Sequence, residues 1–560
     1  MDDPTRVEWR EWGEAAFDEA ASADSPVLLS LTATWCDHCH EMDEETYAEP
    51  RIAANVNDSF VPIRVDVDRY PRVRDRYNMG GFPSTVFLAP DGSVLTGAGY
   101  LGPDGMRQVL DSVRTMWQTK GSGAGRIPRP LREDSPPAGE LTADVEAAML
   151  GQLNETYDEA AGGWGQRPKF PLPDALEFAL KRDQKMALRS YDAVSANLLD
   201  EYDGGFYRFA AERDWAGLQH EKLADSNGAL VRAFANAYLL TGKDEYREPA
   251  ERTIDFLTTT LWNDAVDAVA NSQAPGEDAA HTIDVTDRAT ADEPPVDRGV
   301  LAGPNGLVIE GLLTYYAYTD DERARRYAER ALETVRTELL RNGVVIHGLE
   351  GTDDEPTAPL SAATDEDGEP IPLLANQARV LTALTTAASS IGVEADVLAD
   401  ATAVADATID RLRDGDSFVD GPEAGAGLLD RPLRPLDTNV AIADALLELA
   451  AVTGDDRYRD IARETLEAFA GASDRLGVQM ARYATAVSRL LEGPLVIRVG
   501  TESGTDLHRA ALRMADHEKV VVPEADALES GTARVERGNR ISETAETPDE
   551  LSERVQSILE

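Results

Sequence analysis

Cysteine and lysine are both scarce in this chain of 560 residues, which has two cysteines, Cys36 and Cys39, and seven lysines. An isolated pair of thiols in a reducing compartment is more often catalytic or metal-binding than a structural crosslink. No apolar run approaches the roughly 18 residues that suggest a membrane helix. The first 20 residues lack the basic and apolar regions of a signal peptide. We therefore expect a cytoplasmic protein.

Basic residues are also few: the chain has 54 basic and 103 acidic residues, which gives a formal net charge of -49. Such a surface repels nucleic acid and anionic lipid, so we expect neither as a partner. With 42% apolar residues the chain is nevertheless able to build packed domains. An aspartate-rich, lysine-poor surface on a folded protein suggests adaptation to a high-salt cytoplasm, where self-repulsion is screened.

Residues 1–120 have the pattern of a compact α/β domain. The apolar runs 26–33 and 60–68 predict buried strands, and residues 84–100 predict a hairpin around an Asp-Gly turn. An amphipathic helix is expected to begin at Pro103. Residues 121–140 are rich in Gly, Pro and charge without periodicity, which indicates a linker.

Residues 141–493 are predicted to be almost entirely helical, with a repeated helical hairpin. The segments that start at Gly228, Gly306 and Asn439 resemble one another, and a fainter copy starts at Asn376. Hairpins that recur without strands bury their apolar faces against each other, as a solenoid or a closed ring. Their uneven spacing favours an (α/α) toroid. Residues 494–560 alternate strand and helix, which predicts a small α/β region.

The two cysteines lie in the motif Cys36-Asp37-His38-Cys39-His40, which fits three kinds of site. A c-type haem site requires export, and a zinc site usually has a second pair of ligands. A redox dithiol fits the position after a buried strand, because a helix start stabilises the thiolate of Cys36. Cys39, one turn later, would resolve a mixed disulfide. Pro83, in the sequence GGFPST, is predicted to follow a cis peptide bond.

These features resemble the thioredoxin superfamily over residues 25–118, with Trp35-Cys36, Cys39 and Pro83 at the matching positions. The resemblance implies that Cys36, Cys39 and Pro83 form the catalytic site and that Trp35 contacts the substrate. Where thioredoxins bury an aspartate before the first cysteine, this chain has Ser30. His38 or His40 could move protons instead, and we predict His38 as a catalytic residue.

Further motifs beyond the linker carry a second resemblance: GGWGQRPKFP at 162–171, GGFYRFAAERDW at 204–215, HEKL at 220–223, PNGL at 304–307 and DRP at 430–432. Together with the CxxC domain they resemble the thioredoxin-domain proteins described as domain of unknown function 255, which include spermatogenesis-associated thioredoxin proteins. The resemblance implies a helical toroid similar to that of six-hairpin glycosidases and sugar epimerases, with a carbohydrate-related cavity. Gln219 and Ser226 replace a histidine and an aspartate of the family pattern.

Five residues on the Gly-rich loops are candidates for substrate binding in the ring: Trp164, Lys169, Asp203, Phe206 and Glu221. Glycoside hydrolysis needs two carboxyl groups of unequal proton affinity, for which Asp203, Glu221 and Asp225 are the candidates. For Lys169 an ion pair with a nearby carboxylate is the simpler interpretation, and the aromatic residues fit the core equally well.

The sequence thus predicts a thioredoxin-like α/β domain, an (α/α)6 toroid and a small C-terminal α/β region. The predicted function is thiol–disulfide exchange on a protein or small-molecule disulfide, with no cofactor and no metal. A carbohydrate-active enzyme that works in the toroid is the first alternative. A non-catalytic scaffold whose dithiol holds zinc is the second.

Overall fold

The structure is a computed structural model that describes residues 4–132, 135–276, 281, 291–351, 358–360, 363–364, 368–392 and 395–560. The chain forms two compact units. One comprises residues 1–135, 274–295 and 419–434, and the other comprises residues 136–273, 296–418 and 435–560. The second unit holds both the helical ring and the C-terminal α/β region.

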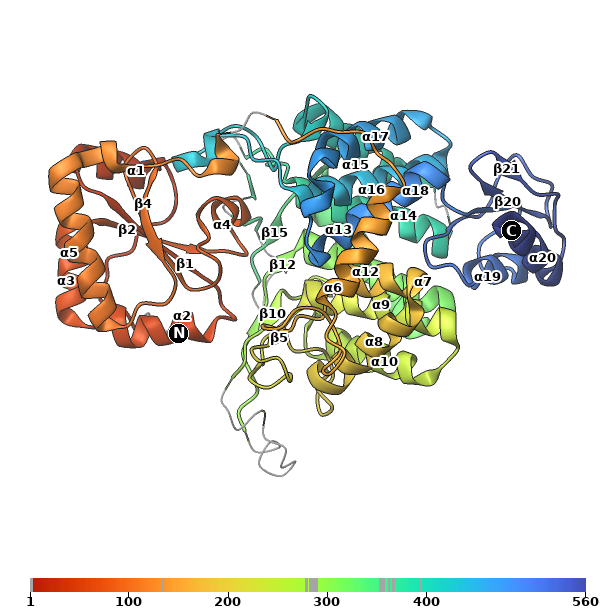
Figure 1. Ribbon diagram of the computed structural model, residues 1–560, viewed down its shortest axis with the longest axis horizontal. Coiled ribbons are helices and arrows are strands. Elements are labelled where there is room, and N and C mark those ends of the chain that lie inside the picture. The colour runs from red at the N-terminus through yellow and green to blue at the C-terminus, as the bar shows by residue number, and fades with distance from the viewer. Residues whose placement is uncertain are drawn as a thin grey trace. The chain divides into compact units, whose positions relative to one another are not determined.

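The first unit is built on a four-stranded sheet in the order β2-β1-β3-β4 (Figure 1). Its strands are β1 (Val27–Thr32), β2 (Val61–Asp66), β3 (Ser84–Leu88) and β4 (Val94–Ala98). β1 and β2 are parallel, whereas β3 is antiparallel to both β1 and β4. The first five residues of β1 are buried, as expected of a central strand that is covered on both faces.

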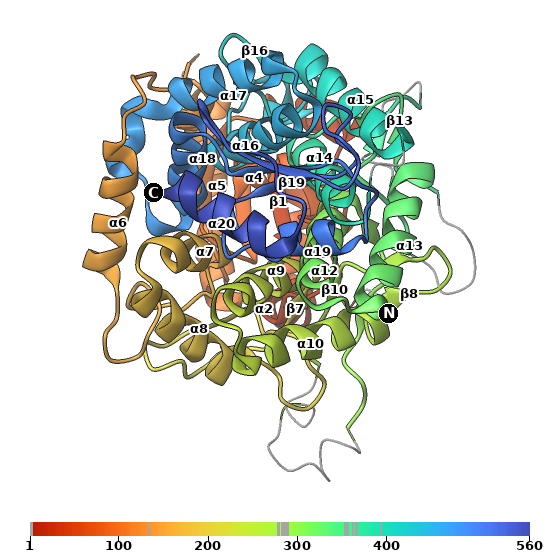
Figure 2. The same ribbon diagram turned by 90° about the vertical axis from the view of Figure 1, so that its right-hand side faces the viewer.

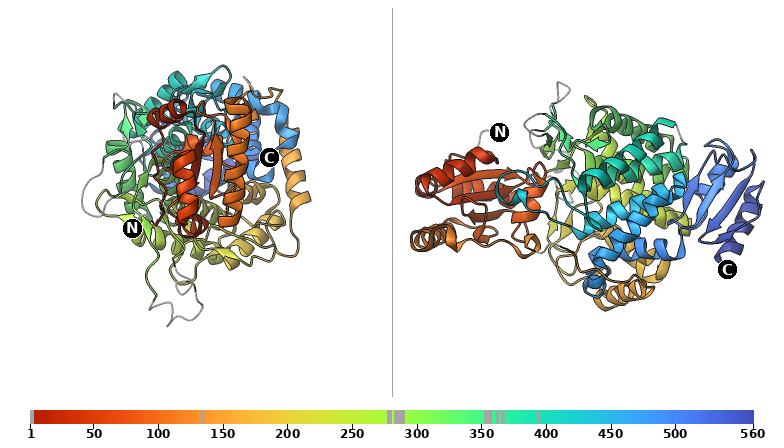
Figure 3. Two further views of the ribbon diagram at one scale, coloured as in Figure 1. Left: turned by 90° about the vertical axis from the view of Figure 1, so that its left-hand side faces the viewer. Right: turned by 90° about the horizontal axis from the view of Figure 1, so that it is seen from above.

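Helices α3 (Pro50–Ser59) and α5 (Pro103–Lys120) pack against each other beside this sheet (Figures 1 and 3). Their buried side chains share one apolar cluster with Leu28 of β1 and Phe87 of β3. Both helices begin with proline at the first turn, where the missing N–H is not needed. Two further helices of the unit are α1 (Glu14–Ala23) and α4 (Pro71–Tyr77).

Residues 419–434, which follow the toroid strand β17 (Ser417–Phe418), belong to the first unit through contacts with α4. Arg72 and Arg76 both bind the carboxylate of Asp420, at 3.1 Å and 2.6 Å. Their guanidinium groups also donate to five main-chain carbonyls, those of Pro422, Ala424, Leu428, Leu429 and Arg431. Two arginines of the N-terminal domain thus hold a distant segment of the chain.

The expected linker begins in the first unit as well. Arg126 exchanges two main-chain hydrogen bonds of 2.9 Å with Val94 of the edge strand β4. Arg126 thereby covers part of the exposed edge of β4.

Six helices form a closed inner ring in the second unit, each in contact with the next and the last with the first (Figure 2). In ring order they are α7 (Pro173–Arg182), α9 (Ala224–Thr241), α12 (Ala302–Thr319), α14 (Leu374–Ser390), α16 (Leu436–Thr453) and α18 (Ala481–Glu492). Six outer helices pair with them in the same order: α8 (Gln184–Leu198), α10 (Asp244–Thr259), α13 (Glu322–Glu338), α15 (Ala395–Leu412), α17 (Asp456–Phe469) and α6 (Asp144–Thr156). The predicted hairpin repeats and the toroid are therefore confirmed.

Two glycines of the inner helices have a packing role. A Cβ at Gly228 of α9 would lie 2.7 Å from the backbone nitrogen of Val308 in α12. A Cβ at Gly311 of α12 would lie 2.4 Å from the carbonyl oxygen of Gly228. Only glycine lets these two inner helices approach so closely, because any other residue places atoms where the neighbouring backbone already lies.

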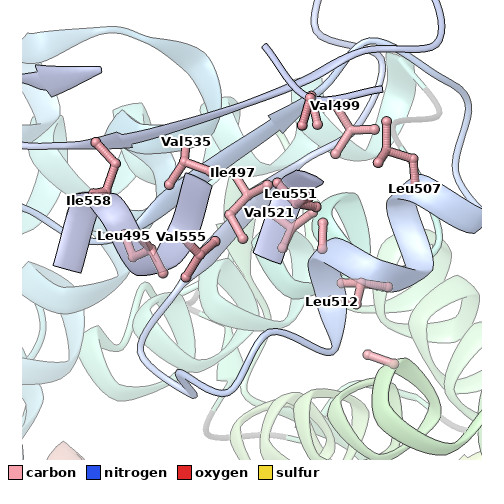
Figure 4. Close-up of a cluster of buried hydrophobic side chains, with 14 residues drawn as sticks. Leu495, Ile497, Val499, Leu507, Leu512, Val521, Val535, Leu551, Val555 and Ile558 are labelled. Carbon is pink, nitrogen blue, oxygen red and sulfur yellow. The ribbon is translucent and has the colours of Figure 1, made fainter. Parts of the chain in front are cut away.

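The C-terminal region is a four-stranded sheet in the order β19-β18-β20-β21, made of β18 (Val496–Val499), β19 (Val520–Val522), β20 (Ala533–Arg537) and β21 (Arg540–Ile541). β18 is parallel to β19 and antiparallel to β20, the same order and directions as in the N-terminal sheet. Helix α20 (Pro548–Leu559) lies against this sheet (Figure 3, right). Figure 4 shows the apolar core between the strands, α20 and α19 (Asp506–Leu512).

Candidate redox site and the loops of the ring

Cys36 and Cys39 form a disulfide bond, with the two sulfur atoms 2.03 Å apart. Cys36 is the N-cap residue of α2 (Asp37–Met42) and follows the strand β1 after a short turn. The amide N–H of Cys39 donates to Sγ of Cys36 over 3.2 Å. The helix start predicted at this sulfur is therefore present, and a backbone donor points at it.

The two sulfurs differ in access. Cys36 is 6% exposed and Cys39 is 2% exposed, so the first cysteine is the more accessible. In the reduced state, a hydrogen bond from the Cys39 amide would favour the thiolate of Cys36 over the thiol. This geometry is suited to an attacking Cys36 and a resolving Cys39.

The peptide bond between Phe82 and Pro83 is cis, as predicted. The ring of Phe82 meets the indole of Trp35 edge to face, with centroids 5.9 Å apart. Trp35 in turn donates from Nε1 to Oδ2 of Asp68 over 2.7 Å. These contacts place the proline loop beside the residue that precedes Cys36. Asp68, which the sequence argument did not single out, holds the indole in place.

Ser30 and His38 bear on proton transfer at the dithiol. Ser30 is buried in β1, so no carboxylate occupies its position in the strand. His38 is on α2 between the two cysteines, with 65% of its side chain exposed. Its Nδ1 lies 3.2 Å from Oε2 of Glu41, and its ring meets the edge of Tyr100 at 6.1 Å. His38 is thus accessible to solvent, and its catalytic role stays a prediction.

Lys169 lies at the other candidate site, in the ring unit, and is fully buried. Its Nζ is 3.2 Å from Oδ2 of Asp158 and donates to the carbonyl of Gly162 over 3.1 Å. Burial lowers the pKa of Lys169, and Asp158 opposes that effect. The pKa of Asp158 is held below its usual range, chiefly by a hydrogen bond from Arg213. The ion pair that the sequence suggested for Lys169 is present.

A second loop repeats this arrangement. Lys222 is also buried, with Nζ 2.7 Å from Oδ2 of Asp200 and a hydrogen bond of 2.8 Å to the carbonyl of Gly204. In both loops the aspartate accepts from two following amides, and an aromatic residue comes six positions after it. The repeated spacing Asp-x-x-x-Gly-Gly-aromatic is the feature of the sequence that could have revealed the pair.

The other residues predicted for the ring have the following surroundings. Trp164 and Phe206 are 2% and 1% exposed, and Phe206 stacks on Phe234 of α9. Glu221 is 6% exposed and pairs with Arg208 at 3.1 Å. Asp203 is exposed on the turn after Asp200.

These positions bear on the substrate-binding roles expected of the five residues. Trp164, Phe206 and Lys169 are enclosed by other side chains, so direct contact with a substrate would require the loops to open.

Two general features of the described ranges concern membranes and metals. Among the residues that the structure describes, no helix has the length and apolar character needed to cross a bilayer. The same residues contain no group of three or more His, Cys, Asp or Glu side chains arranged to hold a metal ion.

Comparison with known proteins supports the thioredoxin-like interpretation of the N-terminal part. Residues 2–127 match the family model Thioredox_DsbH, described as "Protein of unknown function, DUF255". The chain is 29% identical over 295 residues to human spermatogenesis-associated protein 20, an alignment that covers 46% of this chain and 37% of the human protein. The chain thus spans little more than a third of that relative.

A shorter similarity concerns the thiol:disulfide interchange protein DsbD 1 of Pseudomonas aeruginosa. The two are 35% identical over 83 residues, which is 14% of each chain. Among solved structures, cellobiose 2-epimerase from Spirochaeta thermophila superimposes with a TM-score of 0.45 at 17% sequence identity. That superposition covers 57% of this chain and 83% of the epimerase.

Proposed function

We propose that this protein is a thiol–disulfide oxidoreductase that acts through Cys36 and Cys39. The observation that carries the proposal is the Cys36–Cys39 disulfide at the start of α2, with a backbone amide directed at Sγ of Cys36. The cis-proline loop beside Trp35 and the match to a thioredoxin-like family model support it.

The reaction proceeds in two exchanges. The thiolate of Cys36 attacks one sulfur of a substrate disulfide, a Cys36–substrate bond forms, and the other substrate sulfur leaves as a thiolate. The thiolate of Cys39 then attacks Sγ of Cys36, the Cys36–Cys39 disulfide closes, and the second substrate sulfur leaves. An external thiol returns the pair to the dithiol. In reverse, the disulfide oxidises a substrate dithiol.

Two serine variants test these roles. In a dithiothreitol-coupled assay of insulin disulfide reduction, Cys36→Ser should abolish turnover, since the attacking sulfur is missing. Cys39→Ser should lose steady turnover as well but accumulate a mixed disulfide, which intact-mass analysis detects. The two substitutions have the same chemistry, so each serves as the control for the other. Wild-type turnover in Cys36→Ser would refute the proposal.

The setting of the reaction is part of the proposal. We place the protein in a high-salt cytoplasm, because a net charge of -49 requires screening for compact folding and for the approach of acidic substrates. Dithiol turnover on insulin is expected to increase with KCl concentration under these conditions. A substrate peptide of net positive charge should show the opposite dependence.

A further inference from the structure

A cavity lies inside the helical ring, at the end that the C-terminal sheet covers. Its volume is about 110 Å³, and its walls come from α9, α12, α14 and α16 and from residues 512–521. Figure 2 shows β19 and α19 in front of these helices. Figure 4 labels Leu512 and Val521, the first and last residues of the segment 512–521 that lines the cavity. A second cavity of about 90 Å³ shares Arg232, Asn236, Glu310, Glu448 and His517 with the first.

Most charged groups that line these cavities have partners. Arg232 binds Glu310 at 2.8 Å and Glu177 at 2.7 Å. Glu448 accepts from the hydroxyl of Thr385 over 3.1 Å and pairs with Arg489 at 3.3 Å. Most charges in these walls are therefore ion-paired, as expected of buried charges.

Lys519 is different. Its Nζ donates to the carbonyl of Asp516 over 3.2 Å and lies 4.9 Å from the centre of the Tyr318 ring. Within the described parts of the chain, no carboxylate forms an ion pair with Lys519. By contrast, Lys169, Lys181 and Lys222 each have a carboxylate within 3.2 Å.

His517, two residues before Lys519, also differs from the paired side chains of the cavity walls. Its buried Nδ1 has no hydrogen-bond partner among the described residues. Burial lowers the pKa of His517 to about 4, so this imidazole is neutral. Two nitrogen-bearing side chains, two positions apart in the sequence, thus line the same cavity, and among the described residues neither forms an ion pair.

A partly buried ammonium that forms no ion pair loses its proton more readily than an exposed one, because burial disfavours the charged form. Burial lowers the pKa of Lys519 to about 7, an effect that Asp516 opposes and Lys181 reinforces. A large fraction of the amine is therefore neutral at neutral pH. A neutral lysine amine is a nucleophile toward carbonyl carbon.

We propose that Lys519 forms an imine with a small aldehyde or ketone that enters this cavity. The lone pair of Nζ attacks the carbonyl carbon, and the carbonyl oxygen takes up a proton to give a carbinolamine. Loss of that oxygen as water leaves a C=N bond between Lys519 and the former carbonyl carbon. No oxidant or reductant is needed.

The cavity also fits the other needs of this reaction. Glu448 lines the same space, as do Thr386 and Ser389, whose hydroxyl groups can bind polar substituents of the ligand. The small volume limits the ligand to a few carbon atoms.

Reductive alkylation of the full-length protein tests the proposal. Acetaldehyde is added at pH 7 with sodium cyanoborohydride, which traps an imine as a stable ethylamine, and each lysine is followed by peptide mass mapping. We expect Lys519 to react at least about tenfold faster than the exposed Lys120 and Lys185, because burial increases the neutral fraction of the Lys519 amine. The rate at Lys519 should saturate with acetaldehyde concentration. Lys519→Arg should remove the fast labelling and leave the two exposed sites unchanged.

Three outcomes would overturn the proposal. The first is an unmodified Lys519, and the second is a Lys519 that reacts no faster than the exposed lysines. The third is a rate that rises linearly with acetaldehyde, which shows reactivity without a binding site. None of these readouts involves the dithiol, so failure here is separate from failure of the redox proposal.

Discussion

The substitution Asp420→Asn tests how strongly α4 holds residues 419–434. The side chain of Arg76 is fully buried, and those of Arg72 and Asp420 are 11% and 7% exposed. Asparagine keeps the shape of the side chain but removes its charge, which leaves two buried guanidinium groups without a counterion. Breaking a buried ion pair from one side costs about 3–5 kcal/mol. For a unit of this size that corresponds to a fall of roughly 10 °C in the melting temperature of the first unit.

The assay is thermal unfolding followed by tryptophan fluorescence. The indole ring of Trp12 lies against Gly427 of the same segment, 3.0 Å from the place that a Cβ on this glycine would occupy. Asp104→Asn is the matched control, since Asp104 pairs with Arg107 but is 92% exposed. An exposed pair contributes at most about 1 kcal/mol, so the control should melt within about 3 °C of the wild type. Equal melting temperatures for Asp420→Asn and the control would refute the reasoning.

Three further predictions concern the second unit and the surface. Lys222→Met should lower the free energy of unfolding by about 3–5 kcal/mol, because it removes the ammonium group that pairs with the buried carboxylate of Asp200; a chemical denaturation curve that overlays the wild type would contradict this. Between pH 7 and 10.5 the unfolded chain binds a proton at Lys519 that the folded chain does not, so stability rises with pH across that window. Lys519→Met should therefore stabilise the protein at pH 7 by roughly 4 kcal/mol, with a gain that disappears near pH 10.5, whereas the exposed Lys185→Met should have no such effect. Raising KCl from about 0.1 M to about 2 M should increase the melting temperature, since it shortens the screening length for the net charge of -49; a melting temperature that falls would argue against the high-salt interpretation.

Local patterns in the sequence determined the position of the cysteine pair and the fold class. A buried strand followed by Cys36 and a helix, with Pro83 before the next strand, placed the dithiol and the cis bond correctly. Each of these features depends on a few neighbouring residues, whose backbone preferences follow from their residue types. The hairpin repeats also predicted the ring, because helices with apolar faces and no strands have few ways to bury them.

Tertiary structure alone decided the features that join distant residues. Arg72 and Asp420 are 348 positions apart, and nothing in either local sequence identifies the other as its partner. Lys169 is a candidate binding residue in the sequence but is a buried ion-pair partner in the fold, and Lys222 forms a second buried pair of the same kind. In the sequence, Lys519 is simply the residue before the strand β19, and only the fold places it in the wall of a cavity with residues of four inner helices. Burial and counterions set the charge state of a side chain, and both depend on which distant segments pack around it.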